Sequence, residues 1–153
     1  IELMKLGFNP QYGIDNHFLK KAAGKKKIME LESLDYQINL LSGFSDEEQE
    51  LFLLHTLKDL KILKQETGKL LQAWLTGDAK GIEAIASRVN GDRRLVRIYE
   101  KLYYERNAAM TSKIEEFLKT KETYFVVIGA GHLVGNKGII ELLKRKGYLV
   151  EQI

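Results

Sequence analysis

The hydrophobic pattern over the first 121 residues is mainly helical. Ser45 and Glu48 have the spacing of a capping box, and the leucines that follow share one helical face. Other segments carry apolar residues at helical spacing between capping or terminating residues. The predicted helices are 14–24, the long segment after Ser45, 69–76, a segment after Asp78 that includes Ile82, Ile85 and Val89, and 93–121, whereas 1–13 and 90–92 are predicted to be a loop and a turn.

Segment 93–121 is the longest of these patterns. Its apolar residues occupy two strips, so the helix is apolar around more than half of its circumference. A helix of this kind is expected to pack against neighbours on two sides. The polar residues Glu105, Arg106 and Asn107 interrupt the two strips.

Two further segments indicate strands near the end of the chain. Residues 124–129 form a continuous apolar run, which is typical of a buried parallel strand. A helix predicted within 136–147 separates this run from a second apolar segment, 148–152. With a short strand near 27–32, the pattern predicts a mostly helical α/β domain with a small, largely parallel sheet. The predicted C-terminal unit is a right-handed βαβ.

A glycine-rich turn after residue 128 allows two interpretations. Gly129, Gly131 and Gly135 follow a predicted strand, and Glu151 lies about twenty residues further on, as in dinucleotide-binding sites. However, the glycine spacing is one residue too long. A dinucleotide-binding unit also usually forms the first part of its fold, whereas this unit is the last one in the sequence. The other interpretation is that the glycines present His132 at the carboxyl end of a strand, where imidazole can bind a metal or accept a proton. A purely structural turn remains an equal alternative.

Three charged residues are the other candidates. Glu105 and Arg106 lie beside the apolar strips of the long helix, where burial is costly unless charges are paired or ligated. Glu32 ends the first predicted strand, close to where His132 is expected if the strands are parallel neighbours. An internal salt bridge and, for Glu32, an ordinary solvated acid are the alternatives.

Composition narrows the function classes. The 153 residues correspond to one domain by length, and 44% hydrophobic with 29% charged residues is ordinary for a globular protein. The absence of cysteine excludes thiol catalysis, thiolate metal sites and disulfides. A net charge of +3 with dispersed basic residues does not indicate nucleic-acid binding.

Three segments together resemble the TraB/GumN family, which also includes the TIKI proteins. They are GIDNHFLKKAAGKKKIMELESLDYQ at 13–37, ERNAAM at 105–110 and VVIGAGHLVGNKGIIELLKRKGYLVE at 126–151, and the similarity extends over nearly the whole chain. The resemblance implies an α/β fold and a metal-dependent hydrolase, as in TIKI peptidases, acting on a peptide or protein. It favours manganese or cobalt, with zinc as a further option.

The resemblance also implies roles for single residues. His132 and Gly129 match the family's C-terminal G-x-x-H, with Gly131 in the same turn. Glu32 and Gln37 match an L-E-x-x-x-x-Q segment, and Glu105, Arg106 and Asn107 match E-R-N. The metal ligands are then expected to be His132, Glu32 and Glu105, while His132, Glu105 and Arg106 carry catalysis. Asn107, Gln37, Gly129 and Gly131 support them.

One family feature is missing from the sequence. The family carries an earlier G-x-x-H, and neither His17 nor His55 stands in that context. We therefore expect residues 1–153 to be one incomplete domain, the C-terminal part of a longer protein that would be inactive alone. Its expected partners are the missing N-terminal segment and a second copy at an exposed sheet edge. The resemblance implies an extracytoplasmic or membrane-associated location, although any signal or anchor would lie outside this chain.

Three functional hypotheses follow. The first is a metal-dependent peptidase, with a divalent ion held by His132 and an acid. The second is a non-catalytic module that binds or sequesters a peptide signal, as in pheromone shutdown. The third, and the least favoured, is a dinucleotide-binding βαβ unit.

Overall fold

A computed structural model describes residues 2–87 and 93–153. Val89 of the predicted helix and the predicted turn at 90–92 lie outside these described residues. The chain divides into two compact units, Ile1–Leu31 and Glu32–Ile153.

The first unit contains three short helical segments. These are α1 (Glu2–Lys5), the 3₁₀ turn η1 (Pro10–Tyr12) and α2 (Ile14–Ala22). The loop predicted for 1–13 is therefore wrong in part, because α1 and η1 lie within it. The predicted end of α2 is confirmed, since Gly24 follows the helix with φ of +70°, a left-handed conformation that glycine adopts readily.

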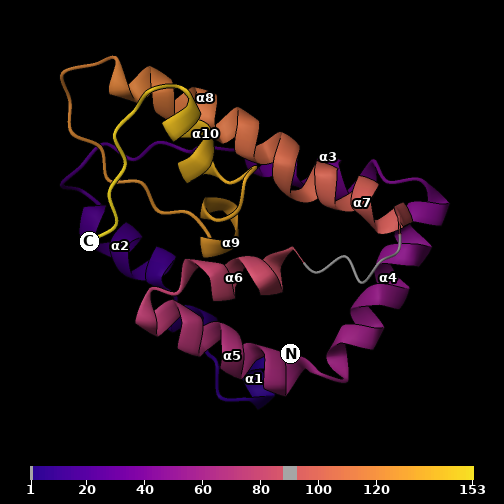
Figure 1. Ribbon diagram of the computed structural model, residues 1–153. Helices are drawn as coiled ribbons and strands as arrows, with labels where there is room; N and C mark the ends of the chain where they lie inside the picture. The colour runs from indigo at the N-terminus through magenta and orange to yellow at the C-terminus, as the bar shows by residue number, and fades with distance from the viewer. Residues whose placement is uncertain (1, 88–92) are drawn as a thin grey trace. The chain divides into compact units, whose positions relative to one another are not determined.

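The second unit is a series of helices (Figure 1). They are α3 (Leu34–Ser42), α4 (Asp46–Leu60), α5 (Leu63–Thr76), α6 (Ala79–Ala86), α7 (Arg93–Tyr99), the π-helix η2 (Glu100–Glu105), α8 (Arg106–Leu118), α9 (Ala130–Leu133) and α10 (Ile139–Arg145). The capping box of α4 is confirmed, with Ser45 and Glu48 bonding each other's backbone N–H groups. The Asp78 cap of α6 is also confirmed, because its carboxylate accepts from the backbone N–H of Gly81.

The long helical segment of α7, η2 and α8 contributes Leu95, Ile98, Met110 and Ile114 to the core. Leu95 and Ile98 on α7 are buried with Phe44, and Leu51 and Phe52 of α4 pack against them. Further along, α10 packs against α8. The segment thus meets a neighbour along each of its halves.

The predicted α/β fold is wrong. Within residues 2–87 and 93–153 there is no strand, and the described fold is all-α. The segments predicted as strands, 27–32, 124–129 and 148–152, form no sheet, and the predicted βαβ unit is therefore absent. An apolar run satisfies the side-chain pattern of a strand, but a strand also needs a neighbour that pairs with its backbone.

Two helices, α3 and α9, occupy segments for which the sequence predicted no helix. α3 begins at Leu34, because the Ser33 hydroxyl accepts from the backbone N–H of Tyr36. α9 follows directly after Gly129. The helix predicted within 136–147 is confirmed as α10, followed by Gly147 at φ of +91°. None of the described helices is long and apolar enough to span a bilayer.

Candidate functional site

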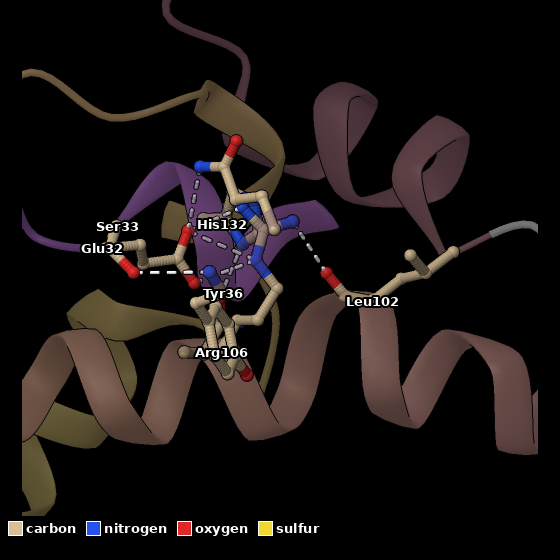
Figure 2. A network of polar contacts seen from close by, with 8 residues as sticks. Glu32, Ser33, Tyr36, Leu102, Arg106 and His132 are labelled. Atoms are coloured by element: carbon tan, nitrogen blue, oxygen red, sulfur yellow. Dashed lines mark hydrogen bonds and ion pairs between the residues drawn. The ribbon is translucent and has the colours of Figure 1, made fainter. Parts of the chain in front are cut away.

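The first element of the site is an ion pair between Glu32 and Arg106 (Figure 2). Glu32 immediately precedes the cap residue of α3, and Arg106 is the first residue of α8. The Arg106 Nε lies 2.8 Å from Glu32 Oε1, and Nη2 lies 2.6 Å from Oε2. This geometry is the two-pronged pairing that a planar guanidinium makes with a carboxylate.

Other contacts hold the same pair in place. The Gln37 amide lies 3.5 Å from Glu32 Oε2, and the Arg106 Nη1 donates to the Leu102 carbonyl at 3.1 Å. Only 8% of the Glu32 side chain and 19% of the Arg106 side chain are exposed. Each nitrogen of the Arg106 guanidinium thus makes a bond, and the guanidinium holds Glu32 in place.

The π-helix explains how Arg106 reaches this position. η2 ends at Glu105, directly before Arg106, and the carbonyl that receives the Arg106 side chain belongs to Leu102 inside η2. π-helical turns inside α-helices occur frequently at functional sites. The change of helical form coincides with the polar interruption that the sequence shows at 105–107.

The second element is the pair formed by His132 and Asn107. The short helix α9 presents His132, whose backbone N–H donates to the Gly129 carbonyl at 2.9 Å. The His132 Nδ1 lies 2.7 Å from Asn107 Oδ1. Asn107 is 2% exposed, and its Nδ2 donates to the backbone carbonyl of Lys137 at 2.9 Å.

These contacts assign the hydrogen on the imidazole. The Lys137 carbonyl can only accept, so the NH₂ group of Asn107 must face it, and the amide oxygen must face His132. An amide oxygen also only accepts, and therefore Nδ1 of His132 carries the hydrogen. In the neutral ring this leaves the lone pair on Nε2, which is the atom available to a ligand.

Electrostatics are consistent with a neutral imidazole. Burial lowers the pKa of His132, and the nearby Arg106 charge lowers it further, while Glu32 opposes the change. Hydrogen bonding from Arg106 lowers the pKa of Glu32 against the effect of burial. Near neutral pH the site therefore holds a carboxylate, a guanidinium and an uncharged imidazole.

An aromatic stack borders His132. The rings of Tyr103 and His132 have centroids 5.2 Å apart, and Tyr99 stacks on Tyr103 at 5.6 Å with 13° between the planes. Tyr103 was not among the candidates from the sequence. The signal that could have found it is the four-residue spacing of Tyr99 and Tyr103 on one helical face, immediately before Arg106.

The structure brings most of the predicted site residues together, but not all of them. The structure brings Glu32, Gln37, Arg106, Asn107, Gly129 and His132 into one bonded or electrostatically linked group. Gly131 lies under Tyr103, where an added Cβ would be 3.6 Å from the ring. Glu105 is exposed, and the described residues show no bond from it to this group. They also contain no cluster of three or more histidine, cysteine or acidic residues suited to a metal ion.

The dinucleotide alternative loses its structural basis. It depends on a strand before the glycines and on a second strand, 148–152, that contains Glu151, and neither forms in the described chain. Of the motif glycines, Gly135 has a φ of +82°, a conformation that favours glycine, and the tightest steric requirement is at Gly138, where a Cβ would lie 2.2 Å from the Val134 carbonyl oxygen. Gly138 caps α10 and was not part of the predicted motif.

Comparison with known proteins agrees with the resemblance seen in the sequence. The model of the TraB/PrgY/gumN family matches residues 1–152. The chain is similar to a "Metalloprotease TIKI homolog" of Amphimedon queenslandica, with 38% identity over 58 residues, and to "Metalloprotease TIKI1" of Danio rerio, with 40% over 53. These matches cover 37% and 33% of this chain, and 11% of each relative.

A longer match is with a protein of Treponema pallidum. It is 24% identical over 146 residues, covering 86% of this chain and 43% of that protein, which is described as uncharacterized. No solved structure matches. Because the family model covers nearly every residue, the chain belongs to the TraB/PrgY/gumN family.

Proposed function

We propose that this chain contributes His132, with its supporting residues, to the site of a metal-dependent peptidase that acts on a peptide or protein. Membership of the TraB/PrgY/gumN family and the similarity to TIKI metalloproteases support the reaction class. The TIKI matches cover only about a third of this chain, so metal-dependent peptide hydrolysis is proposed here and is not shown by the similarity.

The observation that carries the proposal is the contact between His132 and Asn107. Histidines that bind metals usually donate their other ring N–H to an oxygen, which fixes the tautomer and the ring orientation. The 2.7 Å contact to Asn107 Oδ1 does this for Nδ1. Because the Lys137 carbonyl holds the Asn107 amide in one orientation, the Nε2 lone pair is pre-arranged.

The described residues fit a divalent ion only in part. His132 fits as one nitrogen ligand, whereas both oxygens of Glu32 accept from Arg106 and Glu105 is exposed. The proposal therefore requires ligands from outside the described residues, such as a further segment of the protein. When bound, a divalent ion supplies Lewis-acid polarisation of a carbonyl and an activated water. The chain's own contribution is orientation: Asn107 orients the His132 ring, and Arg106 orients Glu32.

Manganese provides a direct test, because paramagnetic Mn²⁺ broadens the NMR signals of nearby protons. The chain has three histidines, so His17 and His55 serve as internal controls. In a protein that includes the further ligands, we expect substoichiometric Mn²⁺ to broaden the His132 ring signals before those of His17 and His55. Asn107→Leu, which removes the Nδ1 acceptor, should weaken this selectivity without removing the imidazole.

Activity is the second part of the test. Peptide hydrolysis that requires manganese or cobalt, and that His132→Ala abolishes, would support the proposal. Uniform broadening of all three histidines, together with hydrolysis that is absent or insensitive to His132→Ala, would contradict it.

A second candidate is a non-catalytic peptide-binding module. The observation that favours it is that the only acid bonded within the described site is fully engaged by Arg106. We expect such a module to bind a peptide equally well with and without a chelator and to leave the peptide intact. Loss of peptide affinity on chelation would exclude it.

A further inference from the structure

A recess lies directly beside the His132–Asn107 pair. With the space that opens to solvent included, its volume is about 400 Å³. It is lined by residues of α6, by Tyr99 and η2, by the first turn of α8, and by α9 and the turn that follows it. Its lining includes Glu83, Tyr99, Tyr103, Asn107, Gly131 and Lys137.

The recess and the proposed site share two residues. Tyr103 lines the recess and stacks near His132 at 5.2 Å, and Asn107 lines it while holding His132 Nδ1. A group bound in the recess would therefore lie next to the imidazole. This adjacency makes the recess a candidate subsite for part of a substrate.

The two charged groups that line the recess differ in their contacts. Lys137 points its ammonium at the face of Tyr104, 4.3 Å from the ring centroid, and lies 3.8 Å from Glu100. Glu83 is half-buried, and no hydrogen bond or ion pair to its carboxylate is found among the described residues. Its Oε1 lies 3.0 Å from the point where Gly135 would carry a Cβ, so the carboxylate sits against a bare stretch of backbone.

A carboxylate beside tyrosine rings is chemically suited to a cation. Ammonium groups bind aromatic faces, and a carboxylate accepts charge-assisted hydrogen bonds from them. The contact between Lys137 and Tyr104 shows the same pairing within the chain itself. A half-buried carboxylate that has no partner among the described residues gains most from a ligand that brings the opposite charge.

We propose that the recess binds a primary ammonium group of a peptide, held by the Glu83 carboxylate against the rings of Tyr99 and Tyr103. This assignment rests on the proposed function, because it makes the recess a specificity subsite beside His132. The ammonium can come from a free peptide N-terminus or from a lysine side chain, and both present the same chemistry.

The test is a peptide titration followed by NMR in chelator, so that no metal or catalysis is involved. The probes are tetra-alanine amide with a free N-terminus, its N-acetylated form, an acetylated peptide with one lysine, and the same peptide with norleucine in place of lysine. The signals observed are the amides of Gly131 and Gly135 and the ring of Tyr103. Glu83→Gln is compared with Glu116→Gln, an exposed acid that does not line the recess.

We expect at least one ammonium peptide to shift these signals and to bind about tenfold more tightly than its neutral counterpart. Glu83→Gln should remove that advantage, and Glu116→Gln should leave it intact. Preference for the free N-terminus identifies a terminal amine, and preference for lysine over norleucine identifies a side chain. Equal affinity for ammonium and neutral peptides would overturn the proposal, as would an ammonium preference that survives Glu83→Gln.

The comparison of peptides on the unaltered chain does not depend on the folding of any variant. It also separates the two proposals. Binding that depends on Glu83, without metal-dependent cleavage, would retain the subsite and reject the peptidase. Metal-dependent cleavage that is indifferent to acetylation and to lysine would retain the peptidase and reject the subsite.

Discussion

Glu32 and Glu48 each stand near the beginning of a helix, and each meets a cation from the same long helical segment. Glu48 lies in the first turn of α4 and pairs with Lys101 at 2.9 Å, while it also accepts from the Ser45 backbone. Glu32 lies just before α3 and pairs with Arg106. The two cations are only five residues apart in sequence.

The two acids nevertheless serve different purposes. Glu48 completes a capping box, so its oxygens satisfy a backbone N–H at a helix end. Glu32 caps no helix; a planar guanidinium holds it close enough to influence the charge of His132. The Glu48–Lys101 pair thus stabilises a helix end, whereas the Glu32–Arg106 pair, at the other end of η2, belongs to the candidate site.

The largest expected difference concerns stability. Glu32→Gln leaves the Arg106 guanidinium without its counter-charge, and we expect it to lower the free energy of unfolding by about 2 kcal/mol. Glu48→Gln keeps a hydrogen-bonding group at the cap beside better solvated cations, and should cost about 1 kcal/mol or less. Urea denaturation of both variants measures the difference. Equal losses would show that the two pairs are energetically alike.

Exchange of the cations sharpens the same comparison. Arg106→Lys replaces two parallel hydrogen bonds and the Leu102 contact by a single ammonium, at an expected cost of about 1 kcal/mol. Lys101→Arg should change stability by no more than about 0.5 kcal/mol, because its pair is partly solvated. Denaturation midpoints at neutral pH test both. A larger loss from Lys101→Arg would contradict the argument.

Acid should remove the contribution of both carboxylates. Hydrogen bonding from Arg106 lowers the folded-state pKa of Glu32, and bonding from Lys101 lowers that of Glu48, both from 4.5. A lowered folded-state pKa gives stability that is complete above the unfolded value and is lost as pH falls through the folded value. The stability differences between the wild type and Glu32→Gln or Glu48→Gln should therefore shrink below pH 4.5. Differences that persist in acid would mean that charge is not their source.

The smallest expected effect is on the titration of His132 in the metal-free chain. Its NMR midpoint should lie below 6.5, because burial and Arg106 both lower its pKa. Glu32 opposes this change, so Glu32→Gln should lower the midpoint further, whereas Glu48→Gln should leave it unaltered. An upward movement in Glu32→Gln would show that Glu32 does not act on the imidazole.

Local signals explain what the sequence could predict. The caps at Ser45 and Asp78 and the glycines after α2, α5 and α10 depend on a few neighbouring residues, and the structure confirms them. The long helical segment was predictable because its apolar pattern repeats over many turns. The grouping of Arg106 and Asn107 with His132 came from polar residues that interrupt that pattern, together with the family resemblance.

Long-range pairing explains the failures. A strand near 124–129 requires a partner whose position the local pattern does not contain, and the described chain provides none. Glu105 and Arg106 are sequence neighbours, yet only Arg106 turns toward Glu32, because adjacent helical residues point in different directions. The Lys137 carbonyl that orients Asn107 is a backbone atom, which no side-chain motif can indicate.

The π-helix also offers a way to change helical phase without altering any side chain of the site. Each residue of an α-helix corresponds to about 100° of rotation about the axis. A π-helix turns less per residue, because its hydrogen bonds span five residues instead of four. If Glu100–Glu105 wound as an ordinary α-helix of the same length, Arg106 and Asn107 would be turned away from Glu32 and His132, while Leu95 and Ile98, which precede this segment, would keep their places in the core. The register of the site relative to the scaffold is thus set by the winding of one six-residue segment.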